Sequence, residues 1–401
     1  MPDLHANRLA VPALVGTFGI QTLAATAMFG VSVVAPAAAP DIGVEATHVG
    51  TFTAIAYGSG MVAGLIAGAL ADRYGAIRVS QLTMIFAFLA CCFFAFGTPW
   101  AAFASAIALG LCYGPVNPAS THILARVVPE RSRPLYFSIK QTGMPAGAAL
   151  AGATLPTLVD QFGWQTAILV AGGAAVLIGI CVQPLRQPID RQRDSEREIK
   201  FGSLWTPLSV VWHASRLRSL AFMGFVYSGS QVTIMTLYVV YLTSELTMSL
   251  TLAGVIYMVL QISAVVGRLF WGAIGDRLVA SRKLLVLIGL GSAVFCALSG
   301  FYSIEWPIWA IASVSFLLGI TTSGWNGLFF SELVKHAPKG KTGEAAGGLQ
   351  FATLSGVMIF PAVFGVLIGL FDSYLMAFSL LAGVIVLAAL QFAASFAKEY
   401  A

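Results

Sequence analysis

Residues 68–75 read GALADRYG, and a shorter copy, GAIGDR, occupies residues 272–277. Each copy follows an apolar stretch and ends with an acidic and a basic residue side by side. Two further segments repeat: GIQTLAAT at 19–26 matches GSQVTIMT at 229–236, and LGLCYGPVN at 109–117 matches LGITTSGWN at 318–326. Because the three offsets stay between 204 and 210 residues, we predict that the chain consists of two halves of common design.

The composition is that of a membrane protein. Hydrophobic residues make up 58% of the 401 residues and charged residues only 10%, and the mean hydropathy is +0.85. A soluble domain has about 25% charged residues, so this chain could not cover a water-facing surface. Apolar stretches of about 20 residues, the length that crosses a hydrocarbon core of about 30 Å, recur throughout the chain. We therefore predict an all-α polytopic membrane protein.

The apolar stretches predict twelve transmembrane helices. Membrane-spanning strands alternate apolar and polar residues, whereas these stretches are apolar on all sides. The predicted spans are 12–36, 48–70, 79–97, 99–123, 135–159, 163–182, 217–243, 249–273, 282–301, 306–331, 342–369 and 372–396. They form two pseudo-symmetric six-helix bundles, residues 1–182 and residues 217–401, which a polar cytoplasmic linker over residues 183–216 connects.

Basic residues are confined to one side of the predicted membrane. Twenty of the 22 Lys and Arg residues lie near the termini or in the segments that follow even-numbered spans, and the opposite loops contain none. Because positively charged loops stay in the cytoplasm, we predict a multi-pass protein of the inner cell membrane with both termini cytoplasmic. The net charge of +5 follows from this topology, so no nucleic-acid partner is expected.

With these residues, the chain resembles the major facilitator superfamily over its entire length. The resemblance rests most on the loop with Gly68, Asp72 and Arg73 and on its second copy with Gly272, Asp276 and Arg277. In that family this loop is a cytoplasmic gate: the first glycine allows close helix approach, and the aspartate interacts with a facing helix N-terminus. The chain departs from the family pattern at Ile77, where a second basic residue is usual. The family architecture implies a substrate between the two repeats and alternating access to it.

Two cations lie inside predicted spans. Arg268 stands in SAVVGRLFWGAIGDR (263–277) and Lys140 in SIKQTGMPAGAALAG (138–152), whereas no acidic residue lies deep in a span, since Glu332 and Glu344 are near cytoplasmic ends. An arginine or lysine at the centre of a spanning helix costs about 2.5–3.5 kcal/mol on insertion scales. A bound anion would neutralise such charges, and the arginine fork suits a carboxylate. The alternative is that both side chains bond backbone carbonyls or extend to the cytoplasmic edge.

Family resemblance also indicates the kind of substrate. Arg268, eight residues before Asp276, resembles the substrate arginine of monocarboxylate transporters and of the oxalate:formate exchanger. The KQTG segment at 140–143 is similar to the cyanate/nitroimidazole-transporter branch, which implies small anionic or polar solutes. Other residues expected to line the site are polar or aromatic side chains at mid-span: Gln21, Tyr113, Asn117, Gln231, Gln261, Trp325, Asn326 and Gln350. The two aromatic side chains have packing or contact with lipid as their alternative role.

The sequence therefore favours a secondary active transporter of a small organic anion, a mono- or dicarboxylate, by proton symport or anion exchange. The alternative is a proton-coupled efflux pump for drug-like or apolar compounds, which the glycine/proline pattern of Gly143, Pro145 and Gly147 faintly suggests. We expect no enzyme, because no HExxH motif, phosphate loop or nucleophile–base set is present, and no cofactor or metal. The expected partners are the substrate, protons (with His122 as a candidate carrier) or a second anion, and the lipid bilayer around a monomer.

Overall fold

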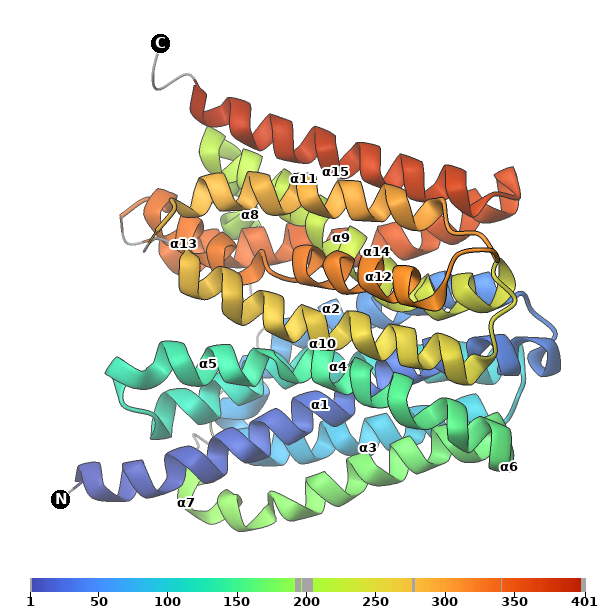
Figure 1. The fold of residues 1–401 in the computed structure, drawn as a ribbon. Coiled ribbons are helices and arrows are strands. Elements are labelled where there is room, and N and C mark those ends of the chain that lie inside the picture. Colours follow the sequence, from blue (N-terminus) through green and yellow to red (C-terminus); the bar gives the residue numbers. More distant parts are fainter. Residues whose placement is uncertain (1, 192–195, 197–204, 276–277, 340, 398–401) are drawn as a thin grey trace. The chain divides into compact units, whose positions relative to one another are not determined.

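The computed structural model describes the chain apart from residues 1, 192–195, 197–204, 276–277, 340 and 398–401. Regular structure in the described residues is helical (Figure 1). Eleven helical stretches among them are long and apolar enough to cross a membrane. The prediction of an all-α polytopic membrane protein is therefore confirmed.

The contacts divide the chain into two compact units. Unit 1 contains Met1–Ala46 and Ile55–Gly202, and unit 2 contains Thr47–Ala54 and Ser203–Ala401. The helices of unit 1 are α1 (Pro2–Ile42), most of α2 (Val49–Tyr74), α3 (Ala76–Ala95), α4 (Pro99–Val127), α5 (Arg133–Gln141), α6 (Gly143–Cys181) and α7 (Arg186–Asp190). Those of unit 2 are α8 (Trp205–His213), α9 (Ser215–Ser244), α10 (Leu250–Ile274), α11 (Ser281–Gly300), α12 (Ile308–Thr322), α13 (Asn326–His336), α14 (Thr342–Phe371) and α15 (Tyr374–Ala397).

One of the eleven apolar stretches contains two predicted spans. The stretch Leu135–Asp190 is 56 residues long, more than twice the length that one crossing needs. Gly163 interrupts its helix α6 with φ 82° and ψ 160°, a backbone conformation that glycine adopts without a steric penalty. The interruption lies where the predicted fifth and sixth spans meet.

The predicted linker over residues 183–216 is folded at both of its ends. Residues 183–190 form a short 3-10 helix and α7, with Ile189 and Asp190 buried in unit 1. The Asp190 carboxylate accepts hydrogen bonds from the backbone N–H groups of Ile77 (3.1 Å) and Arg78 (3.3 Å), at the start of α3. The first residues after the sixth span are therefore part of the bundle, because Asp190 satisfies amide groups that the helix start leaves unpaired.

The predicted span 306–331 is broken between α12 and α13, whereas its repeat counterpart α4 is continuous. Trp271 on α10 donates its Nε1–H to the carbonyl of Ile320 at 3.0 Å. A continuous helix would pair this carbonyl with the amide of Gly324. A Cβ on Gly324 would lie 2.1 Å from Cδ1 of Trp271, so the glycine leaves room for the indole beside the break.

Glycines allow close helix crossings in both units. A Cβ on Gly114 of α4 would lie 2.2 Å from the carbonyl oxygen of Gly60 on α2. In the corresponding crossing of unit 2, a Cβ on Gly319 of α12 would lie 2.1 Å from the carbonyl oxygen of Leu260 on α10. By contrast, a Cβ on the gate glycines Gly68 or Gly272 would have no atom within 4 Å, among the residues the structure describes. The close approach expected at the gate is found deeper in the helices, and a gating role of the two glycines stays a prediction.

Candidate functional site

Lys140 is the most deeply buried cation that the structure describes in unit 1. It lies at the end of α5 with 1% of its surface exposed. Its Nζ donates a hydrogen bond to Oδ1 of Asn117 on α4. In the described part of the chain, no carboxylate forms an ion pair with this ammonium group. A neutral amide cannot compensate the charge, so the site is suited to an anion.

Close packing of α1 against α6 places Gln21 beside the junction that carries Lys140. A Cβ on Gly147 would lie 2.1 Å from the carbonyl oxygen of Thr22, and a Cβ on Gly143 would lie 2.9 Å from Cγ of Gln21. Gln21 is buried, and its Nε2 lies 3.5 Å from the hydroxyl of Tyr113. Its Oε1 has no hydrogen-bond partner among the described residues, so the amide can still accept one.

Tyr113 and Asn117 present one face of α4, since they are four residues apart. The ring of Tyr113 packs edge-on against that of Tyr57 on α2, with 5.6 Å between the centroids. The structure thus brings four predicted site residues of unit 1 together: Gln21, Tyr113, Asn117 and Lys140. The sequence analysis missed Tyr57, which no repeat or charge distinguishes from other aromatic residues of the spans.

In unit 2, two predicted site residues bond directly to each other. Trp325 donates its Nε1–H to Oε1 of Gln231 on α9 at 3.1 Å, and both side chains are buried. The indole also packs edge-on against Tyr227 and Phe329, with centroid distances of 6.2 and 5.3 Å. These two rings were not predicted. They give Gln231 aromatic surroundings. Apart from helical spacing, nothing in the sequence indicated that Tyr227 and Phe329 belong to this site.

Arg268 and Gln261 lie on α10, two helical turns apart and so on one face. Gln261 is fully buried, and neither amide atom makes a hydrogen bond of normal length and angle within the described residues. Arg268 is half-buried, with its Nε atom enclosed. It is therefore less deeply buried than Lys140, although the sequence favoured Arg268 as the anion ligand.

The remaining predicted lining residues of unit 2, Asn326 and Gln350, form no side-chain hydrogen bond with Gln231 or Trp325 among the described residues. Asn326 is the first residue of α13, and its Nδ2 lies 3.5 Å from the carbonyl of Ser323. Gln350 on α14 is exposed. Asn326 therefore has a local contact at the helix break, and Gln350 presents an exposed side chain.

The gate segment of unit 1 contains a polar contact between an aspartate and a histidine that joins two helices. Oδ1 of Asp72, at the end of α2, lies 2.8 Å from Nε2 of His122 on α4. About a third of each side chain is exposed. The loop itself needs a glycine, because Gly75 has φ 99° and a Cβ there would lie 2.3 Å from the carboxyl carbon of Asp190. The predicted gate residues Asp276 and Arg277 lie outside the described residues.

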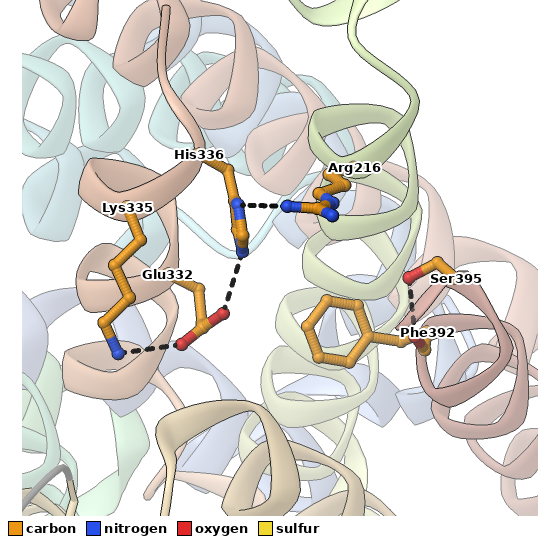
Figure 2. Close-up of polar contacts among 6 residues, drawn as sticks. All are labelled: Arg216, Glu332, Lys335, His336, Phe392 and Ser395. Carbon is orange, nitrogen blue, oxygen red and sulfur yellow. Dashed lines mark hydrogen bonds and ion pairs between the residues drawn. The ribbon is translucent and has the colours of Figure 1, made fainter. Parts of the chain in front are cut away.

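A buried carboxylate corrects one expectation. Glu332 on α13 was predicted to lie at a cytoplasmic end and not to be enclosed, but only 3% of its surface is exposed. Figure 2 shows its two oxygens paired with Nζ of Lys335 (3.1 Å) and Nε2 of His336 (3.3 Å). A helix end can be enclosed by neighbouring helices, which position along the sequence does not reveal.

The same network fixes the tautomer of His336. Nη1 of Arg216, on α9, lies 3.5 Å from Nδ1 of His336 (Figure 2). A guanidinium can only donate, so Nδ1 accepts and Nε2 carries the hydrogen that Glu332 accepts. The carboxylate is thus committed to partners of its own unit. The described residues contain no cluster of three or more His, Cys, Asp or Glu that could hold a metal ion.

Comparisons with known proteins agree with this architecture. The family model described as Major Facilitator Superfamily matches residues 17–361. The hexuronate transporter of Bacillus subtilis is 22% identical over 90% of this chain and 88% of its own length. Among solved structures, a peptide transporter POT in complex with sulfate has a TM-score of 0.75 and 15% identity, covering 96% of this chain and 94% of that chain.

Other relatives match shorter segments. The 4-hydroxybenzoate transporter PcaK of Acinetobacter baylyi is 29% identical over 37% of this chain, and the match covers 33% of the relative. The multidrug resistance protein MdtG of a Rahnella strain is 28% identical over 30% of this chain, and the match covers 28% of that protein. The chain thus matches about a third of the length of these relatives or less.

Proposed function

The chain belongs to the major facilitator superfamily, as a multi-pass membrane transporter and not an enzyme, and from this premise we propose that it transports a small organic anion. The observation that carries the proposal is the buried ammonium of Lys140, which has an amide oxygen and no carboxylate as its partner among the described residues. A substrate carboxylate would supply the missing negative charge. A charge-assisted hydrogen bond in such a site is about twice as strong as a neutral one.

We propose that Arg268 of unit 2 also binds a carboxylate, because its planar guanidinium can form two hydrogen bonds with one. Aromatic rings surround polar residues in each unit, Tyr57 and Tyr113 in one and Tyr227 and Trp325 in the other. They suit a substrate with an aromatic or ring-shaped body. The printed names of two relatives, transporters of 4-hydroxybenzoate and hexuronate, support carboxylates of this kind.

The alternative is efflux of drug-like compounds, which the similarity to MdtG supports. A pump for cations needs an acidic side chain that the substrate can reach. The buried acid described in unit 2, Glu332, is already paired with Lys335 and His336. The anion proposal therefore agrees better with the charges.

A panel of paired compounds tests the proposal. We expect 4-hydroxybenzoate, gallate or glucuronate to stabilise the purified protein thermally and to be taken up by proteoliposomes. The methyl ester of the same acid should do neither, because it has lost the charge that Lys140 and Arg268 bind. Equal binding of acid and ester, or binding of cationic dyes alone, would contradict an organic-anion transporter.

We propose that the inner cell membrane holds the protein with both termini in the cytoplasm, since basic residues such as Arg73, Arg131 and Lys341 are all on that side of the predicted topology. We propose that uptake of the substrate is driven either by symport of a proton or by exchange for a second anion. A single cysteine introduced at Glu245 should react with an impermeant thiol reagent from outside intact cells. Reaction from the cytoplasmic side alone would reverse the orientation.

We assign the cytoplasmic gate to the Asp72–His122 pair. Asp72→Asn keeps the size of the side chain and removes its charge, so we expect uptake into proteoliposomes to slow about fivefold, because a partly exposed ion pair contributes about 1 kcal/mol. Expression should survive, since the change shifts the balance between two conformations and leaves the core intact. Glu305→Gln, at an exposed acid outside this pair, is the control. Uptake by Asp72→Asn at the rate of this control would remove the gate assignment.

A further inference from the structure

An open groove of about 1070 Å³ lies in unit 1 between α2, α3 and α6, and extends to α7. Its polar end contains three arginines, Arg73, Arg78 and Arg186, and no acidic residue is among its described lining residues. Arg73 and Arg78 flank the turn between two spans, and Arg186 follows the end of α6. The guanidinium groups thus gather at one end of the membrane-spanning helices.

The described residues compensate the charges in the groove only in part. Asp190 lies nearby, but its two oxygens accept hydrogen bonds from the backbone amides of Ile77 and Arg78. Among the described residues, none of the three guanidinium groups forms an ion pair, and Arg73 stacks over the ring of Tyr74 at 5.5 Å. Three neighbouring cations of this kind attract an anion such as a phosphodiester.

The other end of the groove is apolar and opens at the outer surface of the helices. Its walls include Leu82, Ile85 and Ile180, of which Ile85 is 51% and Ile180 62% exposed. Gln81 forms part of the groove wall. Its Nε2 donates hydrogen bonds to the carbonyl of Gly179 (3.0 Å) and to Oε1 of Gln183 (2.8 Å). These bonds tie α3 to α6, so the walls are held in place without a ligand.

We propose that this groove binds an anionic phospholipid, with the phosphate on Arg73, Arg78 and Arg186 and the acyl chains along Leu82, Ile85 and Ile180. Basic pockets between spanning helices bind anionic headgroups in this way. A free phosphate ion would use only the basic end, whereas a phospholipid fits both the charge and the apolar walls. Since Arg73 directly follows Asp72, the bound lipid would lie beside the gate pair.

Lipid retention by the purified full-length protein tests this site. Native mass spectrometry would follow the protein with phosphatidylglycerol and with phosphatidylcholine as the uncharged control. We expect phosphatidylglycerol to be retained at least about tenfold more strongly, which corresponds to about 1.4 kcal/mol. The triple variant Arg73→Gln, Arg78→Gln and Arg186→Gln should lose this preference.

The control variant removes the same charge elsewhere, through Arg131→Gln, Lys339→Gln and Lys341→Gln, three exposed residues outside the groove. It should keep the preference. If the triple variant does not fold, Arg186→Gln alone should still weaken retention, since the Arg186 side chain forms no ion pair within the described part of the chain. Equal retention by the groove and control variants would overturn the proposal, and so would displacement of the lipid by millimolar inorganic phosphate, which would indicate a site for the free ion.

Discussion

Lys140→Gln is expected to abolish binding of the organic anion and, at the same time, to raise the melting temperature of the ligand-free protein. Removing one partner of a buried charge pair costs about 2–5 kcal/mol of binding, or roughly 30-fold to several thousandfold in affinity. Without ligand the sign reverses, because Lys140 is 1% exposed and its ammonium group has, among the described residues, only the amide of Asn117 as a side-chain partner. Replacing an unfavourable buried charge by a neutral group stabilises a fold.

Glutamine is the appropriate replacement at this position. Gln350 occupies the equivalent position of the second repeat, so a neutral glutamine already occurs at this position of the repeat. Thermal unfolding with and without ligand measures both effects in one experiment, and Lys341→Gln, at an exposed lysine, is the control. If Lys140→Gln binds the anion with unchanged affinity, the lysine serves only to hold Asn117, and the transport proposal loses its main support.

Arg268 provides an informative comparison. Arg268→Gln should also weaken binding by about 2–5 kcal/mol, and Arg268→Lys by less, because lysine keeps the charge but not the planar fork. The melting temperature without ligand should rise less than for Lys140→Gln, since Arg268 is only half-buried. Similar binding losses with unequal rises in the melting temperature would separate the two cations experimentally.

The architecture could be predicted because it depends on averages along the chain. Apolar length and the side on which Lys and Arg occur are properties of segments, and they indicated helices that the structure confirms. The site depends on individual contacts. Lys140 and Asn117 were both predicted to line the site. They are 23 residues apart in the sequence, however, and the sequence does not show that their side chains form a hydrogen bond. Trp325 and Gln231 likewise come from different helices of one unit.

The details that the sequence did not reveal are those that neighbouring helices decide. The break between α12 and α13 depends on the indole of Trp271 on α10, which donates a hydrogen bond to the carbonyl of Ile320. Asp190 is part of a charged segment that looked like a solvated connector, yet it caps α3. Glu332 is near the end of its helix by position and still buried by packing. Each outcome depends on which side chain lies opposite, which spacing within one helix cannot supply.

Glu332 and Glu130 form a matched pair that measures the effect of burial. Each has a basic partner three residues later on the chain, Lys335 at 3.1 Å and Arg133 at 3.3 Å, but Glu332 is 3% exposed and Glu130 87%. Glu332→Ala should lower the free energy of unfolding by about 2–3 kcal/mol, because it removes two hydrogen bonds and leaves polar partners facing a small cavity. The loss stays below that of a fully buried pair, since Lys335 can extend into water.

Glu130→Ala should change stability by less than about 0.5 kcal/mol, because water already screens its pair. Thermal unfolding of both variants in the same detergent measures the difference directly. Glu332→Gln, which keeps the size and one acceptor oxygen, should fall between the parent and Glu332→Ala, because it removes the charge that Lys335 and the imidazole of His336 face. Equal melting temperatures for Glu332→Ala and Glu130→Ala would show that the network in Figure 2 contributes no more than a surface ion pair.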